Sequence, residues 1–274
     1  MRTKRLLVLY LVLFVIVVLT MIGLLKITGN SALITHRDYP EIAAEGKLRL
    51  ATDYNRSGYY ISGDTIEGFQ YELARAIAEL SGLEVEIVLE MSLADSYEML
   101  NGMTCDVIAR NIPITADSKE LFLFTAPVIL NKQVLVQRSE ENNNGMAPIR
   151  NQLELAHKTL YVPKDSPAIL RLRNLEKEIG DSIFVVQDEL YADEQLIIMV
   201  AKGDIDFAVC DQSIAAKSQE SYPEIDIKTD ISFTQLQSWA IRKESPILLD
   251  SLNRWLDEIR QSGLYDRIYR RYYK

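Results

Sequence analysis

Two stretches decide the fold: Gly102-Met-Thr-Cys-Asp-Val-Ile-Ala109 and Gly203-Asp-Ile-Asp-Phe-Ala-Val-Cys-Asp211. In each stretch a glycine ends a helical pattern, and an aspartate three or four residues later begins a short apolar strand. The two units lie about 100 residues apart in the chain. Their repetition predicts two lobes of similar construction.

Outward from these units, short apolar strands alternate with amphipathic helices from Lys47 onward. Strands are predicted at 48–52, 85–89, 106–109, 134–136, 159–162 and 207–210. A helix between the first two strands carries Phe69, Leu73, Ile77 and Leu80 on one apolar stripe. Such alternation is typical of an α/β fold with a mostly parallel sheet.

The C-terminal part of the chain predicts two more helices. Ser245-Pro246 begins one whose apolar stripe runs from Leu248 to Ile259. The last ten residues hold four tyrosines and four cations, which allows a wall-binding or nucleic-acid-binding tail. The spacing of Leu264, Ile268 and Tyr272 instead favours a terminal amphipathic helix with a solvated basic face.

The net charge limits the partners. The chain has 274 residues, with 39 acidic and 30 basic side chains. Residues 1–30 contain four of the cations and no acid, so the remaining 26 basic and 39 acidic residues give the body a charge of −13. Nucleic acids and anionic lipid headgroups are bound mostly through Lys and Arg, so both are excluded as expected partners.

The N-terminus predicts a membrane anchor. Leu6–Leu25 is a run of 20 uncharged residues, and Arg2, Lys4 and Arg5 precede it. This length spans a bilayer, and the positive-inside rule places the following chain outside the cytoplasm. We therefore expect a cytoplasmic tip and transmembrane anchor at 1–30, a linker at 31–46 and a body in the periplasm, on a single-pass protein of the cell (inner) membrane. The alternative is a signal peptide cleaved near Asn30-Ser31-Ala32.

The cysteines and histidines indicate neither a disulfide nor a metal site. Cys105 and Cys210 each lie in an apolar run, which is typical of a buried free thiol. His36 and His157 have no Cys or His at ligand spacing. No cofactor is expected, and no Ser/His/Asp or Cys/His constellation indicates catalysis.

A family resemblance is carried by stretches that occur in one order along residues 46–274. They are Gly46-Lys-Leu-Arg-Leu-Ala-Thr-Asp53, Gly68-Phe-Gln-Tyr-Glu-Leu-Ala, Asp106-Val-Ile-Ala, Pro113-Ile-Thr-Ala-Asp, Phe124-Thr-Ala-Pro127 and Gly203–Asp211. The chain resembles the extracytoplasmic solute-binding proteins of family 3, which have the type 2 periplasmic-binding-protein fold. Within that family, Lys132–Arg138 and Ser238–Arg242 look most like the binding half of membrane-bound lytic murein transglycosylases of type F.

The resemblance implies a two-lobed clamshell that closes on a ligand. Lobe 1 would comprise 47–138 and 237–274, lobe 2 would comprise 139–236, and two crossing strands would form the hinge. The ligand would lie at the carboxyl ends of the strands. The lysozyme-like catalytic domain of the transglycosylases would begin where this chain stops, so we expect a protein that is not an enzyme.

The same resemblance implies a set of ligand-binding residues. The acidic residue that binds the ligand ammonium in this family corresponds to Asp211. The alternative is that Asp211 caps the following helix. The residue at a helix N-terminus that contacts the ligand in this family, where a carboxylate is favoured, corresponds to Ser166. Ser166 is equally well explained as an ordinary N-cap. An aromatic platform falls on Tyr59 and Tyr60. The full predicted set is Asp53, Tyr59, Tyr60, Arg110, Asn111, Ser166 and Asp211.

Two departures from the amino-acid-binding pattern bear on the ligand. The family carries a Thr where this chain has Pro113, and a carboxylate-binding Arg where it has Ser118. Arg110 is either a replacement guanidinium in the cleft or a surface arginine.

The resulting hypothesis is a membrane-anchored binding protein for an amino acid, peptide or muropeptide. It would act as a sensor, a regulator or a transport receptor, with a transporter or lytic enzyme as its protein partner. The alternative is a non-catalytic remnant or regulatory subunit of a lytic transglycosylase, with the tyrosine-rich C-terminus docking a separate lytic domain.

Overall fold

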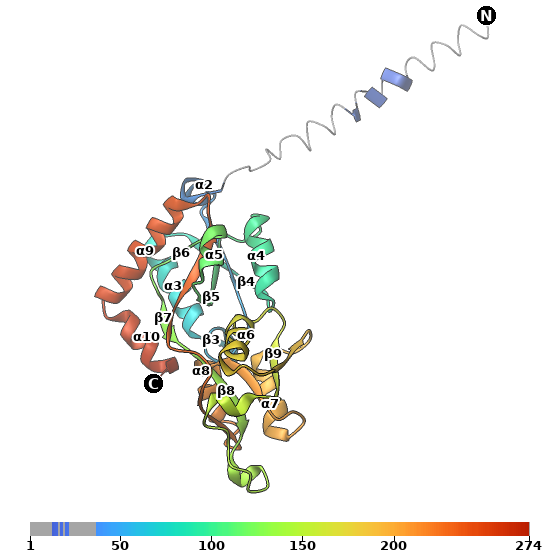
Figure 1. Ribbon diagram of the computed structural model, residues 1–274. Coiled ribbons are helices and arrows are strands. Elements are labelled where there is room, and N and C mark those ends of the chain that lie inside the picture. Colours follow the sequence, from blue (N-terminus) through green and yellow to red (C-terminus); the bar gives the residue numbers. More distant parts are fainter. Residues whose placement is uncertain (1–12, 16, 19, 22–36, 274) are drawn as a thin grey trace, which may run out of the picture. The chain divides into compact units, whose positions relative to one another are not determined.

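The computed structural model describes residues 13–15, 17–18, 20–21 and 37–273 (Figure 1). The chain divides into two units, 1–37 and 38–274. In the first unit, the described residues 13–15, 17–18 and 20–21 are helical. Most of the predicted anchor Leu6–Leu25 lies outside the described residues. Within the described part of the chain, no helix has the length and apolar character needed to cross a membrane.

The second unit is built on two mixed sheets. The first has the strand order β4-β1-β5-β13-β6, with β7 also paired to β13. Its strands are β1 (Lys47–Thr52), β4 (Glu84–Leu89), β5 (Val107–Pro113), β6 (Phe122–Phe124), β7 (Ile129–Asn131) and β13 (Gln235–Arg242). Strands β4, β1 and β5 are parallel, whereas β13 runs antiparallel to β5, β6 and β7. The expected mostly parallel sheet is therefore correct for only part of each sheet.

Helices cover both faces of the first sheet (Figure 1). One face packs against α2 (Tyr39–Glu45), α3 (Phe69–Ser81), α9 (Pro246–Gln261) and α10 (Leu264–Tyr273). The other packs against α4 (Leu93–Asn101), and α5 (Ala116–Leu121) leads into β6. Trp239 is fully buried in the larger cluster. Because helices cover both faces of the sheet, β13 is buried continuously from Gln237 to Arg242 and does not alternate.

The second sheet has the order β10-β9-β11-β8-β12. Its strands are β8 (Gln133–Arg138), β9 (Thr159–Pro163), β10 (Phe184–Asp188), β11 (Ala208–Asp211) and β12 (Ile225–Asp230). Its helices are η1 (Glu140–Asn142), η2 (Gln152–Leu155), α6 (Ala168–Ile179), α7 (Asp193–Lys202) and α8 (Gln212–Gln219). Helices α7 and α8 cover one face and α6 covers the other, so this lobe has its own core.

The chain passes between the sheets at two places. It leaves β7 and enters β8 at Lys132, and it returns between β12 and β13. The expected boundary at 138/139 differs from this division, because β8 pairs with β11 and β12 of the second sheet. The expected boundary at 236/237 lies within β13, which begins at Gln235. Strand β8 is buried along most of its length, so its sequence pattern does not reveal which sheet it joins.

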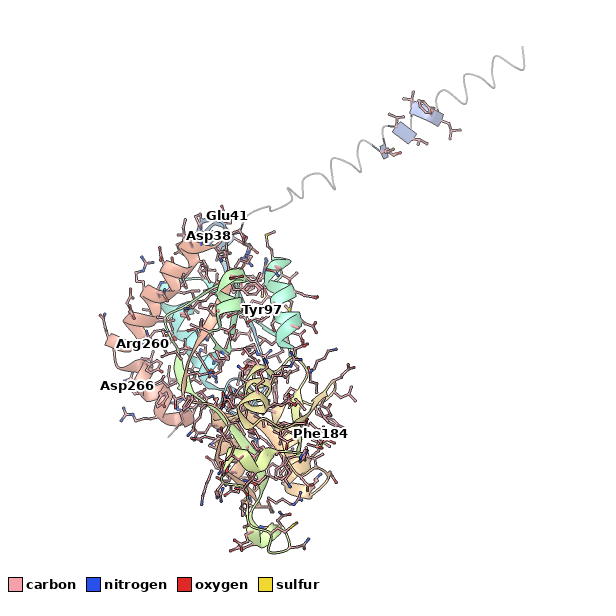
Figure 2. All side chains as sticks on the ribbon, viewed as in Figure 1. Asp38, Glu41, Tyr97, Phe184, Arg260 and Asp266 are labelled. Atoms are coloured by element: carbon pink, nitrogen blue, oxygen red, sulfur yellow. The ribbon has the colours of Figure 1, made fainter. Side chains whose placement is uncertain are left out.

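The expected linker at 31–46 is wrong for its second half. Asp38 and Glu41 form a capping box that begins α2, and both are labelled in Figure 2. The Asp38 carboxylate also accepts hydrogen bonds from the backbone N–H groups of Ile247 and Leu248, at the start of α9. Ile42 is fully buried in the first lobe's core. Segment 38–46 is therefore part of the folded body, and 31–36 lies outside the described residues.

The C-terminal helix packs tightly, as its spacing predicts. Ile268 and Tyr272 are buried. Tyr265, Tyr269 and Tyr273 stack along α10, with ring centroids 6.0 Å and 5.3 Å apart. All three also contact Phe69 edge-on. These tyrosines are thus core contacts of the first lobe.

The cysteines are free and buried, as expected. Cys105 lies in a cluster of the first sheet and Cys210 in a cluster of the second. Burial raises the pKa of the Cys105 thiol to about 12, which keeps it protonated and unreactive.

The hairpin of β2 (Tyr60–Ser62) and β3 (Thr65–Glu67) precedes α3. It leads into Gly68, which has φ of 133°, and a Cβ there would lie 2.2 Å from the carbonyl oxygen of Gly58. The Gly68 N–H donates to the hydroxyl of Tyr272 at 2.9 Å. A glycine is required where the two backbones and α10 meet.

Candidate ligand-binding site

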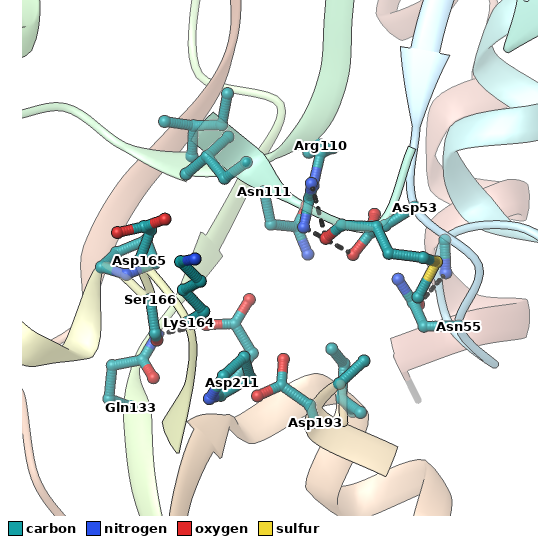
Figure 3. A pocket seen from close by; sticks show the side chains of 18 of the residues that line it. Asp53, Asn55, Arg110, Asn111, Gln133, Lys164, Asp165, Ser166, Asp193 and Asp211 are labelled. Atoms are coloured by element: carbon teal, nitrogen blue, oxygen red, sulfur yellow. Dashed lines mark hydrogen bonds and ion pairs between the residues drawn. The ribbon is translucent and has the colours of Figure 1, made fainter. Parts of the chain in front are cut away.

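A small cavity lies between the two lobes, at the carboxyl ends of their parallel strands (Figure 3). It encloses about 80 Å³. The first lobe contributes Asp53, Asn55, Gly58, Gln70, Met91, Leu93, Arg110, Asn111 and Ile112. The second contributes Gln133, Pro163–Pro167, Ala192, Asp193, Asp211 and Ile214. This position is where open α/β sheets bind ligands.

The topology explains why distant residues meet here. Asp53 directly follows β1, and Arg110 and Asn111 lie toward the end of β5, which is parallel to β1. Asp211 ends β11, and Ser166 follows the neighbouring parallel strand β9. The structure thus brings five of the seven predicted residues to one cavity.

Arg110 is paired with a carboxylate of its own lobe. Its Nη2 lies 3.2 Å from Oδ2 of Asp53, and the two side chains are 15% and 18% exposed. Its Nη1 donates to the carbonyl oxygens of Glu90 at 3.4 Å and Met91 at 3.3 Å. Arg110 therefore faces the cavity, which excludes the surface alternative, but its guanidinium is already engaged.

Asp211 occupies the N-cap position of α8, yet its side chain makes no capping hydrogen bond. It accepts a hydrogen bond from the Nε2 group of Gln133 instead. Burial and the charge of Asp53 raise the pKa of Asp211 to about 7, against the opposing effects of Gln133, Gln237 and Arg110. Helix capping does not account for this aspartate.

Asp193 is a cavity residue that the sequence did not indicate. It is the first residue of α7 and lines the cavity beside Asp211. Burial and the charges of Asp211 and Asp53 raise the pKa of Asp193 well above its ordinary value. Together Asp53, Asp193 and Asp211 surround the cavity with carboxyl groups from both lobes (Figure 3).

Two hydrogen bonds join the lobes next to the cavity. The backbone N–H of Arg56, in the first lobe, donates to Oε1 of Glu194 at 2.6 Å. The Arg56 Nη1 group donates to the hydroxyl of Ser221 at 2.6 Å. Burial raises the pKa of Glu194, and the interactions with Arg56 oppose that rise. These contacts hold the lobes against each other in this conformation.

Asn111 belongs to a buried network that ends in the first lobe's core. Its Oδ1 accepts from Nε2 of Gln70 at 2.7 Å, and Oε1 of Gln70 accepts from Nε1 of Trp239 at 2.7 Å. The Nδ2 group of Asn111 donates to the hydroxyl of Tyr273 at 3.4 Å. The wall of the cavity is therefore fixed to β13, α3 and α10.

The N–H groups at the start of α6 are mostly engaged, so this helix N-terminus is a poorer anion site than the role predicted for Ser166 requires. Pro167 is the N-cap residue and has no N–H group. The Ala168 N–H donates to the Ser166 hydroxyl at 3.3 Å, and the Ile169 N–H donates to the Ser166 carbonyl at 3.0 Å. The Ser166 N–H donates to the carbonyl of Pro163 at 3.1 Å. Ser166 thus lines the cavity mainly as part of a closed turn.

The two predicted tyrosines lie elsewhere and do not line the cavity. The Tyr60 hydroxyl donates to Glu67 at 2.8 Å across the β2–β3 hairpin. Tyr59 packs edge-on against Tyr71. Ser118 is bound in a capping box with Thr115, so it does not take the place of the missing arginine.

Sequence reasoning missed Asn55, Gln70, Gln133 and Asp193. Asn55 accepts three hydrogen bonds at its Oδ1, from Ser57 and Gly58, and so shapes the turn after β1. Asp193 and Glu194 look like ordinary acids of a first helical turn. Their position next to Asp211 follows from the sheet order, which a local pattern does not contain.

Comparisons with known proteins agree with this architecture. The family model described as bacterial extracellular solute-binding proteins, family 3, matches residues 48–274. A membrane-bound lytic murein transglycosylase F from Desulfosudis oleivorans is 32% identical over 235 residues, which are 85% of this chain and 50% of that protein. One from Aeromonas hydrophila is 29% identical and matches over 82% of this chain and 43% of its own length. The chain therefore spans about half the length of these relatives.

Solved structures share the fold. A mutant of the arginine-binding protein of T. maritima has a TM-score of 0.74 at 24% identity, covering 85% of this chain and 98% of that one. An ancestral amino-acid-binding protein, described as a precursor of cyclohexadienyl dehydratase, has a TM-score of 0.73 at 22% identity, covering 86% and 99%. At these identities the likeness concerns the fold alone.

Proposed function

Because the chain belongs to the bacterial extracellular solute-binding proteins of family 3, we propose that it is a membrane-anchored extracytoplasmic module that closes on a small amine-bearing ligand. The observation that supports this most is the position of Asp211. It ends a strand of one lobe, caps nothing, and lies in a cavity whose opposite wall belongs to the other lobe. A carboxylate so placed can make a charge-assisted hydrogen bond to an ammonium group.

The anchoring part of the proposal rests on the sequence. The 20 uncharged residues Leu6–Leu25 follow three cations, which favours an N-terminus in the cytoplasm and a body on the other side of the inner membrane. A fixed anchor suits a protein that reports cleft closure to a neighbour, such as a transporter or a lytic enzyme. In this proposal the chain binds and does not catalyse.

A second candidate follows from the relatives. They are named membrane-bound lytic murein transglycosylase F, and this chain matches about half of their length. The chain would then regulate a lytic transglycosylase, and its ligand would be a peptide-bearing cell-wall fragment. Binding of a muropeptide, with no clearing of peptidoglycan in a zymogram by the protein alone, supports this candidate.

The direct test is ligand binding by the full chain purified in detergent. Thermal shift and calorimetry against amino acids, amines and muropeptides should give at least one ligand that raises the melting temperature. The Asp211→Ala variant should lose that rise, whereas Asp204→Ala, at an exposed acid of the same lobe outside the cavity, should keep it. Failure of the whole panel to bind the wild-type protein overturns the proposal.

A further inference from the structure

We infer that the ligand of this cavity is an organic cation that carries no carboxylate, an amine or guanidinium compound bound between Asp193 and Asp211. This inference rests on the proposed function and narrows it to a ligand class. It departs from amino-acid recognition, in which the site must hold both an ammonium and a carboxylate.

The balance of charge in the cavity favours a cation. Four carboxyl groups line the cavity, those of Asp53, Asp165, Asp193 and Asp211. The guanidinium of Arg110 is paired with Asp53, and although its charge lowers the pKa values of Asp193 and Asp211, burial and the neighbouring carboxyl groups raise both on balance. Lys164 lies in the lining, but its ammonium is 3.5 Å from Glu189. A cationic ligand supplies the charge that this site lacks.

The guanidinium and the helix N-terminus that could bind a ligand carboxylate are engaged within the protein. The N–H groups at the start of α6 bond to Pro163 and Ser166, and Pro167 has none. Arg110 is held by Asp53 and two carbonyl groups. The Nε2 groups of Gln70 and Gln133 donate to Asn111 and Asp211. A ligand carboxylate would lie among the carboxyl groups of the protein, and no free guanidinium would be available to bind it.

A buried amide lies beside the carboxyl group of Asp211. Gln237 of β13 is 1% exposed, and hydrogen bonding of its side chain lowers the pKa of Asp211. A carboxylate accepts such a bond from the Nε2 group, and Oε1 of Gln237 has no hydrogen-bond partner among the described residues. A buried acceptor without a partner is costly, and an ammonium held by Asp211 can donate to it.

A metal ion is a poorer fit to the same carboxylates. Within residues 37–273 and the described part of the N-terminal segment, no three His, Cys, Asp or Glu side chains come together in a way that could hold one. An ammonium or guanidinium group can instead contact carboxylates from both lobes over several ångströms.

The test uses pairs of compounds that differ by one carboxylate. Agmatine is compared with arginine, and cadaverine with lysine, by calorimetry on the full chain in detergent. We expect the decarboxylated member of at least one pair to bind at least tenfold more tightly than its amino acid. Asp193→Asn should weaken that binding at least tenfold, and the control Asp204→Asn should leave it unchanged.

The outcomes separate the two proposals. Tighter binding of the amino acid in both pairs, or binding of an amino acid or muropeptide but of no amine, overturns the inference and leaves the proposed function standing. If neither the amines nor the amino acids and muropeptides bind, both are overturned.

Discussion

Asp53 and Arg110 form an ion pair of 3.2 Å in the first lobe, and Asp211 of the second lobe lies close enough for the charge of Asp53 to raise its pKa (Figure 3). The one guanidinium of the cavity thus neutralises the protein's own carboxylate. Because Arg110 is engaged in this way, it is not free to bind a ligand carboxylate, which favours a cation over an amino acid as the ligand.

Replacing Asp211 should remove ligand binding without unfolding the protein. In Asp211→Ala the charge-assisted bond to the ligand is lost, so the dissociation constant should rise about ten- to hundredfold. The melting temperature of the ligand-free protein should stay within a few degrees of wild type, because the side chain makes no capping bond, and removing a buried carboxyl group of raised pKa offsets the lost bond from Gln133. Calorimetry and thermal denaturation check both values. A collapse of the ligand-free protein would show that Asp211 is needed for the fold.

Replacing Arg110 should strengthen cation binding. In Arg110→Gln the carboxylate of Asp53 loses its partner, so the affinity for agmatine should rise about three- to tenfold. The ligand-free protein should become less stable, because three carboxyl groups then face one another without a guanidinium. Arg75→Gln, at an exposed position of α3, should change neither value. Weaker agmatine binding in Arg110→Gln would mean that Arg110 contacts the ligand directly.

The pH dependence of stability follows from the pKa of Asp211. Its value of about 7 in the folded protein lies above the usual unfolded value of about 3.9. Between these values the folded protein keeps a proton that the unfolded chain releases, so the free energy of unfolding falls as pH rises through this window. Urea denaturation of wild type and Asp211→Asn, from about pH 4 to about pH 8, isolates this effect. The stability of wild type relative to the variant should decrease over that range, and a constant or rising difference contradicts the pKa.

The contact between Arg56 and Glu194 should slow ligand release. Glu194→Gln weakens a bond that joins the lobes, so the dissociation rate should rise about three- to tenfold while the association rate changes little. Stopped-flow kinetics with agmatine measures both. Glu220→Gln, which alters an exposed pair with Lys217, is the matched control. Equal dissociation rates in all three proteins would show that this contact does not hold the lobes closed.

Gly68 should be the most sensitive glycine of the first lobe. In Gly68→Ala the new Cβ would lie 2.2 Å from the Gly58 carbonyl oxygen at φ of 133°, which should cost more than about 3 kcal/mol of stability. Gly63→Ala, at φ of 60° with no atom within 4 Å of the new Cβ, should cost only about 1 kcal/mol. Urea denaturation gives both values. Similar losses at the two positions would rule out the close approach of the two backbones.

The sequence predicted the elements whose pattern is local. Gly82 and Gly203 end α3 and α7 where expected, and the stripes of α9 and α10 are buried as predicted. The strands that were not predicted are β2, β3, β6, β7, β10, β12 and β13. Strand β10 is mostly exposed and β2 and β3 have three residues each, so their formation depends on pairing with other strands more than on their own pattern.

The sequence predicted site residues mainly where they lie at or just after the end of a recognisable strand. Asp53, Arg110 and Asp211 follow or end strands of recognisable pattern, and the structure brings them together. Asp193 lies at the start of a helix, and its place beside Asp211 depends on how α7 packs over β11. The sequence does not contain that packing, nor the ion pair that engages Arg110.

The central claim is that the cleft closes on a carboxylate-free cation. It is tested most directly by energy transfer between dyes on cysteines introduced at Glu79 in the first lobe and Lys177 in the second, both exposed; the native Cys105 and Cys210 are buried and should not react. Agmatine should raise the transfer efficiency to a plateau that follows its binding curve, and the same protein carrying Asp211→Ala should show no change. An unchanged efficiency at saturating agmatine, or a rise with arginine alone, would contradict the account.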